Sequence, residues 1–440
     1  MAVANRKIRS RMLLTTALVA VSSVPGVAQA QLVTSGDLSS AVDSAGTGGQ
    51  LTVTDTSATQ TDIEVEAAVV VAEWTDFNIG TGDTVNVTID AGLGITEATL
   101  FNRVIGLNPS NIDGTLNAAG INFWLVNQNG IIFGNDTSIN AQSFFASTLD
   151  VANQDVFDFY ENTDGFGNGI ETLNFAGVAT NAVQALGNAS FVTDGSLAFV
   201  GQQLNLTGSF DSGSGRAIFL TAADVDVQFT PGSPLTYTVN AGTTVAASQV
   251  IGGTVEGASS EFAMFTAAGV VNALLQVDAN VTATTATATD RGITLIASQP
   301  GGTPDIALNG TAFSTGEVDV VSGGDFTAAQ NLTGSSVNIN ATGAVGGQAV
   351  VATAGSASVT AGTTISTGNI SATGGDATLS AAGNITTTAI SATAVGMTGG
   401  AIDVDSSSGG ALDLGTIASS GDAALDTTGT LQTGAVTAGG

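Results

Sequence analysis

The chain has 440 residues, of which 58 are Gly, 37 are acidic and 7 are basic, and it contains neither Cys nor His. This composition excludes thiol chemistry, His-based catalysis and the usual zinc ligands. The excess of negative charge also argues against nucleic acid or anionic lipid as a partner. Apolar residues make up 43% of the chain, so the sequence is not typical of disorder.

A basic segment and a short apolar stretch open the chain. Four basic residues lie within residues 6–11, an apolar stretch covers residues 12–24, and Ala28 and Ala30 form a small-x-small site. This layout is typical of a secretory signal peptide cleaved after Ala30. The stretch is too short for an integral membrane span, and no later segment is long enough for one. We therefore expect residues 1–30 to direct export by the Sec machinery.

Two turn clusters bracket an apolar stretch in the first half of the chain. Asn108-Pro109-Ser110-Asn111 precedes it, and Asn127-Gln128-Asn129-Gly130 follows it. Asn and Gly tolerate the left-handed backbone of sharp corners, Pro fixes the entry to a turn, and Asn side chains can bond their own turn. Between the clusters, residues 121–125 alternate as in a half-buried strand, and a buried strand begins at Ile131.

The last third of the chain is periodic. Three sets of apolar residues recur at a spacing of 20: Ile339, Val359 and Leu379; Val345, Ile365 and Ile385; Val350, Ile370 and Ile390. The same offsets return in Leu425, Leu431 and Val436 after an irregular rung near residues 397–417. Short β-type segments at this period, separated by Gly and Asn turns, predict a parallel β-helix. The repeats continue to the last residues, so we expect the chain to be the N-terminal piece of a longer polypeptide.

Candidate catalytic groups are few. Arg103, Arg216 and Arg291 are the basic residues after the signal, and they are scattered. Asp224 and Asp226 share one face of a predicted strand, but paired surface acids are normally solvated. A glycan-active β-helix enzyme is therefore a minor alternative. We predict no catalytic residue, no cofactor and no metal site.

The ordered motifs of residues 99–134 resemble the secretion domain of filamentous haemagglutinin-type two-partner secretion exoproteins. The run contains Phe101-Asn102-Arg103-Val104, Asn108-Pro109-Ser110, Ile112-x-Gly114-x-Leu116 and Asn127-x-Asn129-Gly130-Ile131. WTDFNIGTGDTVNV (74–87) and FFASTLDV (144–151) also fit the pattern. Gln128 stands where the family usually has Pro.

The resemblance implies an all-β fold: a right-handed parallel β-helix with an N-terminal cap and a small extrahelical β-sheet. The resemblance covers residues 31–270, which we expect to form the secretion domain. With the predicted signal peptide and the periodic repeats, the chain is expected to comprise 1–30 as signal peptide, 31–270 as secretion domain and 271–440 as β-helical repeats. The resemblance further implies recognition in the periplasm by modules of a dedicated outer-membrane β-barrel transporter. The chain would then be secreted to the surface of a Gram-negative bacterium, where it would act as an adhesin on an unidentified receptor.

The residues expected to carry recognition form one motif set: Arg103, Asn108, Pro109, Ser110, Asn127, Asn129, Gly130 and Ile131. They could serve recognition, or they could serve only as structural corners of the β-helix. For Arg103 we favour pairing with a buried acid. A second interpretation of the whole chain is the rod of a contact-dependent inhibition toxin.

Overall fold

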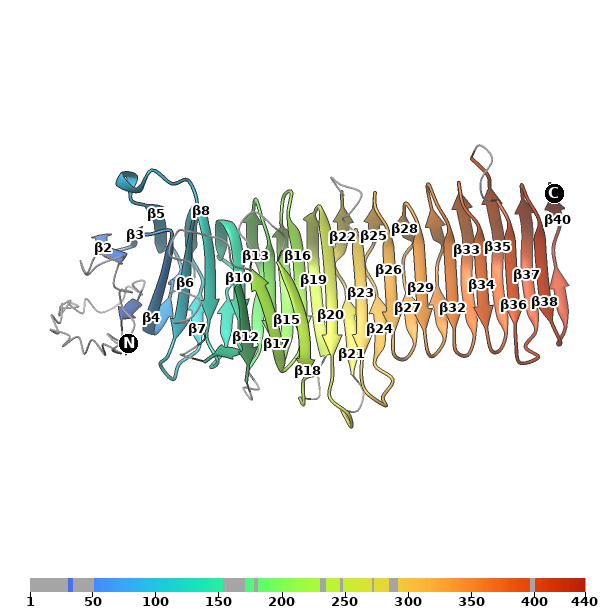
Figure 1. Cartoon of the computed structure of the whole chain (residues 1–440), viewed down its shortest axis with the longest axis horizontal. Helices are drawn as coiled ribbons and strands as arrows, with labels where there is room; N and C mark the ends of the chain where they lie inside the picture. The colour runs from blue at the N-terminus through green and yellow to red at the C-terminus, as the bar shows by residue number, and fades with distance from the viewer. Residues whose placement is uncertain are drawn as a thin grey trace, which may run out of the picture.

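The computed structural model describes residues 31–34, 51–152, 155, 171–177, 181–229, 235–245, 248–270, 273–284, 292–395 and 400–439. The predicted signal peptide, with Ala28 and Ala30, lies outside these residues. The described chain winds into an elongated solenoid, and its strands lie side by side along the rod from the N-terminal to the C-terminal end (Figure 1).

The N-terminal elements comprise the first fourteen strands and one short 3-10 helix. Their bounds are β1 (Gln31–Thr34), β2 (Leu51–Ser57), β3 (Gln60–Val65), β4 (Val69–Asn78), β5 (Thr84–Ile89), η1 (Ala91–Leu93), β6 (Ala98–Val104), β7 (Ser110–Ile112), β8 (Thr115–Val126), β9 (Ile131–Phe133), β10 (Ser138–Ser147), β11 (Asp150–Val151), β12 (Glu171–Ala176), β13 (Val183–Thr193) and β14 (Leu197–Gly201).

The central elements are β15 (Leu204–Asp211), β16 (Arg216–Thr221), β17 (Asp224–Phe229), β18 (Thr236–Ala241), β19 (Ser248–Gly257), β20 (Ser259–Phe265), β21 (Leu274–Val277), β22 (Asn280–Ala283), β23 (Ile293–Ser298), β24 (Asp305–Leu308), β25 (Ala312–Ser314), β26 (Val318–Ser322), β27 (Phe326–Ala328) and β28 (Leu332–Gly334).

The C-terminal elements are β29 (Val337–Ala341), β30 (Val345–Gly347), β31 (Val350–Ala352), β32 (Ala357–Ala361), β33 (Ile365–Thr373), β34 (Ala377–Ala381), β35 (Ile385–Thr393), β36 (Ile402–Ser406), β37 (Leu412–Ser419), β38 (Ala423–Thr427), β39 (Leu431–Thr433) and β40 (Val436–Ala438).

The solenoid has three faces, each a ladder of parallel strands. The first face contains β4, β6, the end of β8, the end of β10, β14, β16, β20, β23 and β26. The second face runs from β3 and β5 to β22 and β25, and the third from β7 and β9 to β24 and β27. Parallel strands joined by short corners in this way form the predicted parallel β-helix.

The N-terminal end departs from this parallel pattern. β1 pairs antiparallel with β4, and β2 pairs antiparallel with β3. An antiparallel partner occupies hydrogen-bonding groups that the first parallel strands would otherwise leave at an open edge. These two pairings supply the N-terminal cap that the family resemblance implied.

Inward-facing apolar side chains fill the solenoid and stack from rung to rung. Phe199, Phe219 and Phe262 occupy the same register position on β14, β16 and β20. The ring centroids are 5.7 Å apart for Phe199 and Phe219 and 5.0 Å apart for Phe219 and Phe262. These separations match the strand spacing of a sheet, so each ring packs on the ring of the previous rung.

A second apolar core lies outside the solenoid. The antiparallel strands β11, β12, β17 and β18 form a separate four-stranded sheet that packs on the outer side of the first face. Trp124 and Val126 point into this second core and are 5% and 0% exposed. The prediction that residues 121–125 alternate as in a half-buried strand was therefore wrong at Trp124, because the extrahelical sheet covers the side of β8 expected to face water.

The C-terminal repeats have the predicted register. Val359 pairs with Ile339 and with Leu379 on the first face. Ile365 and Ile370 lie in one strand, β33, and stack on Ile385 and Ile390 of β35. Across the irregular rung, Leu425, Leu431 and Val436 pair with Val404, Leu412 and Ile417. The period of 20 thus predicted both the stacking and the place where one rung is longer.

Shortening one buried side chain of the repeats is expected to reduce stability slightly. Ile365 is 1% exposed, and Ile365→Val removes one methylene from the core at a cost of about 0.5–1.5 kcal/mol. Urea unfolding of the purified chain measures this cost. Val321→Ala removes two carbon atoms from a side chain that is 39% exposed, and it should cost less. An equal or larger loss for Val321→Ala would contradict this account of the core.

Candidate functional site

The two turn clusters of the sequence meet at one corner of the solenoid. The first cluster leads into β7 and the second leads into β9, and these two strands pair in parallel with Ser110 opposite Ile131. Residues 21 positions apart in the sequence are thereby stacked on neighbouring rungs. We call residues 106–110 together with 127–130 the Asn corner.

Asn127 is the central residue of the Asn corner. It is 1% exposed, and its Nδ2 donates to the backbone oxygen of Asn108 and to Oγ of Ser110, both at 3.0 Å. Its Oδ1 accepts from the backbone amide of Asn129 at 2.9 Å. One buried side chain therefore closes its own turn and fastens the turn of the preceding rung, as buried amides require.

Asn129 and Gly130 complete the corner. Nδ2 of Asn129 donates to the backbone oxygen of Gly106 at 2.7 Å. Gly130 has a φ of 114°, which side chains other than Gly rarely adopt. Its carbonyl oxygen accepts from the amide of Ser110 at 3.0 Å. The close approach of Gly106 to Thr75 also admits no side chain, because a Cβ would lie 1.9 Å from the Thr75 carbonyl oxygen.

The corner presents some of its residues to solvent and hides others. Asn108 and Gln128 are exposed and Pro109 is partly buried, and Nδ2 of Asn108 donates to Oδ1 of Asp76 at 2.9 Å. Leu107 is 89% exposed. Ser110 and Ile131 are 0% exposed, so in the folded chain they can shape the corner but cannot touch a partner.

Arg103 belongs to a different cluster from the Asn corner. Its Nη1 lies 3.1 Å from Oε1 of Glu73 on the neighbouring rung, and its Nε lies 2.8 Å from Oδ1 of Asp150. Nη2 donates to the second oxygen of Asp150 at 2.9 Å, so the contact with Asp150 is bidentate. Burial alone would lower the pKa of Arg103, but the hydrogen bonds and charges of Asp150 and Glu73 raise it overall. The predicted pairing of Arg103 with a buried acid is present, since the Glu73 side chain is 5% exposed.

A second arginine cluster fastens the other end of the extrahelical sheet. Arg216 forms an ion pair with Glu261, whose side chain is 7% exposed, and the hydroxyl of Tyr237 donates to the same carboxylate. Arg216 and Glu261 lie on the solenoid, whereas Tyr237 lies on β18. Burial raises the pKa of Tyr237 to about 12, although the charge of Arg216 acts to lower it. The sequence analysis missed this cluster. Its one indication in the sequence was that Arg216 is among the few basic residues after the predicted signal peptide.

Removing the Tyr237 hydroxyl is expected to loosen the sheet without unfolding the rod. Tyr237→Phe keeps the partly buried ring and deletes one hydrogen bond to a charged group, which costs about 1.5–3 kcal/mol. Hydrogen exchange should accelerate in β17 and β18, while exchange in the repeats after residue 300 stays unchanged. Unaltered exchange in β18 would show that the Tyr237–Glu261 bond does not hold the sheet.

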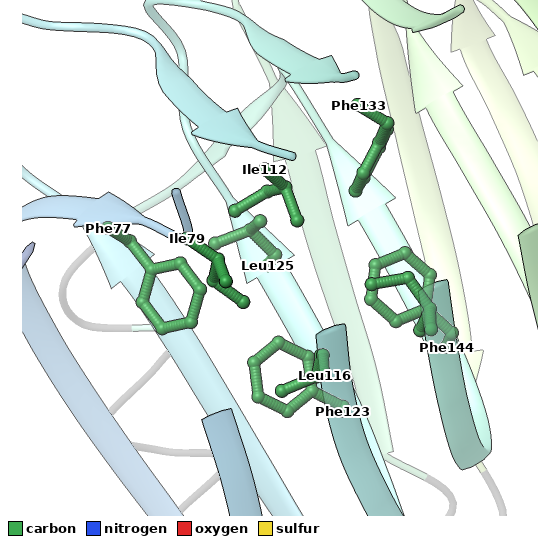
Figure 2. Close-up of a pocket in the computed structure, with 9 residues that line it drawn as sticks. Phe77, Ile79, Ile112, Leu116, Phe123, Leu125, Phe133 and Phe144 are labelled. Atoms are coloured by element: carbon green, nitrogen blue, oxygen red, sulfur yellow. The ribbon is translucent and has the colours of Figure 1, made fainter. Parts of the chain in front are cut away.

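The solenoid interior under the Asn corner offers no polar groups for chemistry. Figure 2 shows the side chains of this region pointing toward one another from several rungs. The lining consists of Phe77, Ile79, Ile112, Leu116, Phe123, Leu125, Phe133, Ile139 and Phe144. A ligand site usually combines apolar walls with a few polar groups, and this lining has only apolar side chains. Within the described residues, no three His, Cys, Asp or Glu side chains gather as a metal site would require, and no helix is long and apolar enough to cross a membrane.

The fold and the Asn corner define a capped parallel β-helix that carries an attached antiparallel sheet. The chain belongs to the TPS secretion domain family, whose model matches residues 39–299. The matched range contains the Asn corner, both arginine clusters and the extrahelical sheet.

Two solved structures are also similar to the chain. One is the HMW1 secretion domain from Haemophilus influenzae, with 14% identity, coverage of 89% of this chain and 97% of that chain, and a TM-score of 0.44. The other is a filamentous hemagglutinin secretion domain, with 12% identity, coverage of 93% and 97%, and a TM-score of 0.35. None of the curated proteins compared with the chain matches it.

Proposed function

We propose that the chain is a secreted exoprotein whose N-terminal domain directs its own export through a dedicated outer-membrane β-barrel transporter. In this scheme residues 1–30 take the chain through the Sec machinery into the periplasm of a Gram-negative bacterium. Periplasmic modules of the transporter then recognise the domain of residues 31–270. The observation that carries this proposal is the family match over residues 39–299.

The Asn corner is our candidate for the recognised element. Asn127 and Asn129 hold the loop of residues 106–110 by three side-chain hydrogen bonds, and a fourth bond, from the Asn129 amide to Oδ1 of Asn127, closes their own turn. That loop carries the exposed Asn108, Leu107 and the partly buried Pro109. Arg103 supports the neighbouring extrahelical sheet instead, so we assign it a positioning role.

Residues 271–440 serve in this proposal as a rod that presents the protein at the cell surface in an adhesin-like role. Stacked rungs give a stiff, extended body, and such a body suits display better than catalysis. The rod of a contact-dependent inhibition toxin would have the same shape, and a glycan-active enzyme would need catalytic carboxylates in a cleft. Binding of the purified chain to host cells, absence of toxicity to neighbouring bacteria and failure to cleave polysaccharides would together favour the adhesin role.

A pair of deletions tests the export function. We expect a chain that lacks residues 39–299 but keeps its first 38 residues to stay in the periplasm when the transporter is present. A chain that lacks residues 301–440 should still reach the medium. If the first deletion is exported as well as the intact chain, the matched domain does not direct secretion.

A further inference from the structure

Corner side chains in the second half of the solenoid bond the backbone of the following rung. Oδ1 of Asp305 accepts from the amide of Asp325 at 2.8 Å, and Oδ1 of Asp325 accepts from the amide of Ala344 at 2.7 Å. Asp305 is the first residue of β24, and Asp325 and Ala344 immediately precede β27 and β30. These three strands pair in register on the third face. Each of the two carboxylates therefore fixes the start of the equivalent strand one rung later.

The same arrangement recurs at other corners of the solenoid. Oδ1 of Asp376 accepts from the amide of Ala401 at 2.9 Å, and Oδ1 of Asn384 accepts from the amide of Ala411 at 2.8 Å. Further acceptors of this kind, each followed by the residue that donates its amide, are Asn280 with Thr311, Asn331 with Ala349, and Ser356 with Asp376. In every one of these pairs the acceptor side chain belongs to the earlier rung.

Side chains that donate a hydrogen bond to another rung follow the same pattern: the donor lies on the later rung and the acceptor on the earlier one. Nδ2 of Asn338 donates to Oδ1 of Asp319 at 2.9 Å, and Oγ1 of Thr353 donates to the carbonyl oxygen of Gly334 at 3.0 Å. Ser322, Ser406, Ser419 and Thr427 likewise donate to backbone oxygens of the rung before. Among the side-chain hydrogen bonds between rungs in the described part of residues 300–439, one is reversed: Oγ of Ser420 accepts from the amide of Ala394. The backbone ladder runs in both directions, since the amides of Ile306 and Phe326 donate to the carbonyl oxygens of Asp325 and Ala344.

The apolar core specifies the register of these rungs only weakly. Ile365 and Ile385 occupy the same place in successive rungs, as do Ile370 and Ile390. A rung that skipped one neighbour would therefore bury almost the same apolar groups, and similar strands with weakly specified register are prone to slip. A second interaction must therefore specify which rung pairs with which. A hydrogen-bonding side chain that is present at some rungs and absent from others can do so.

The corner acceptors do not repeat evenly. On the third face the residue before the aligned apolar side chain of each rung is, in chain order, Asp305, Asp325, Ala344, Thr364, Asn384 and Ala411. Some rungs thus have a carboxylate or side-chain amide oxygen at this corner position, whereas others do not. Charged acceptors form stronger bonds to backbone amides than neutral ones do, so a rung aligned on the wrong neighbour would forfeit a specific bond.

We propose that these corner side chains form a one-way template, in which each completed rung offers fixed acceptors that set the register of the next segment of the same chain. The ligand of each acceptor is the backbone amide of the incoming rung. A rung consequently depends at its corners on the rung before it. The proposal rests on the hydrogen bonds of the described residues and does not require the export route proposed above.

Asp325→Ala in the full chain tests the direction of this dependence. Hydrogen exchange measured by mass spectrometry should show protection in residues 344–362 falling by about 10-fold or more. Protection in residues 305–324 should stay unchanged. Asp325→Asn keeps an acceptor oxygen and should restore most of the protection.

Asp403→Ala is the matched control, because Asp403 is an exposed carboxylate on the outward side of β36. It should leave exchange on both neighbouring rungs unchanged. Equal loss of protection on both sides of Asp325 would overturn the template, since the effect would then have no direction. Absence of any loss in residues 344–362 would overturn it as well.

Discussion

Arg103→Ala is expected to lower the free energy of unfolding by about 3–5 kcal/mol, because it leaves a buried carboxylate without its partner. Glu73 and Arg103 have side chains that are 5% and 10% exposed, so water cannot replace the lost charge. The substitution also removes the bidentate contact to Asp150, which is the first residue of the extrahelical sheet. Denaturant unfolding of the purified chain measures the loss.

A double substitution distinguishes an unpaired charge from a general packing defect. Arg103→Met combined with Glu73→Leu removes both buried charges and fills the space with apolar groups, which is often neutral or stabilising for buried pairs. We expect the double variant to recover most of the stability that Arg103→Ala loses. A loss below about 1 kcal/mol for Arg103→Ala would place this pair among weak surface ion pairs and contradict the argument.

Asn127→Ala combined with Asn129→Ala is expected to abolish export while a full-length chain still accumulates in the periplasm. The two substitutions delete the side-chain hydrogen bonds that hold residues 106–110, the turn of the preceding rung. They also leave the carbonyl oxygens of Gly106 and Asn108 without those donors. The loop would then no longer present Asn108 and Pro109 in a defined arrangement. Immunoblots of medium and periplasm, with the transporter present, measure the effect.

Asn117→Ala with Asn122→Ala is the matched control for this experiment. Both residues lie on β8 between the two turn clusters, and they donate to Asn86 and Glu97 rather than to the corner. We expect this control pair to be exported at the level of the unaltered chain. Normal export of the Asn127 and Asn129 variant would show that the corner serves the geometry of the β-helix alone.

The sequence predicted those parts of the fold that repeat or that concentrate turn residues. The period of 20 placed Val359 between Ile339 and Leu379, as the ladder of the first face confirms. The Asn-rich clusters were predicted as corners, and β7 and β9 stack them on neighbouring rungs. Both signals are local: one is the spacing of inward apolar side chains, and the other is the chemistry of tight turns.

The extrahelical sheet was expected from the family resemblance but could not be placed from the residues alone. Its strands come from four segments, 150–151, 171–176, 224–229 and 236–241, and the solenoid strands β13 to β16 lie between the second segment and the third. The antiparallel pairing of β12 with β17 is therefore long-range, and no single stretch carries the pattern. The same sheet explains why Trp124 is buried where alternation predicted an outward position. It also explains why the partner of Arg103 is Asp150, 47 residues away in the chain.

The clusters of the candidate site were predictable to different degrees. The motif set joined Arg103 to the Asn corner, but the structure assigns Arg103 to the second core and leaves the corner to Asn108, Asn127 and Asn129. The Arg216–Glu261–Tyr237 cluster had no motif to indicate it. Buried ion pairs between neighbouring rungs join residues far apart in the chain. They depend on which side chains the coiling brings together, and spacing along the chain does not reveal this.

Export of the intact chain, with and without its outer-membrane transporter, tests the central claim most directly. The chain would be produced with its first 30 residues, the predicted signal peptide, in a Gram-negative host. Medium, surface and periplasmic fractions would then be immunoblotted. We predict that the protein reaches the medium or the cell surface only when the transporter is present and otherwise stays in the periplasm. Equal amounts outside the cell in both strains would contradict a transporter-dependent role for the secretion domain.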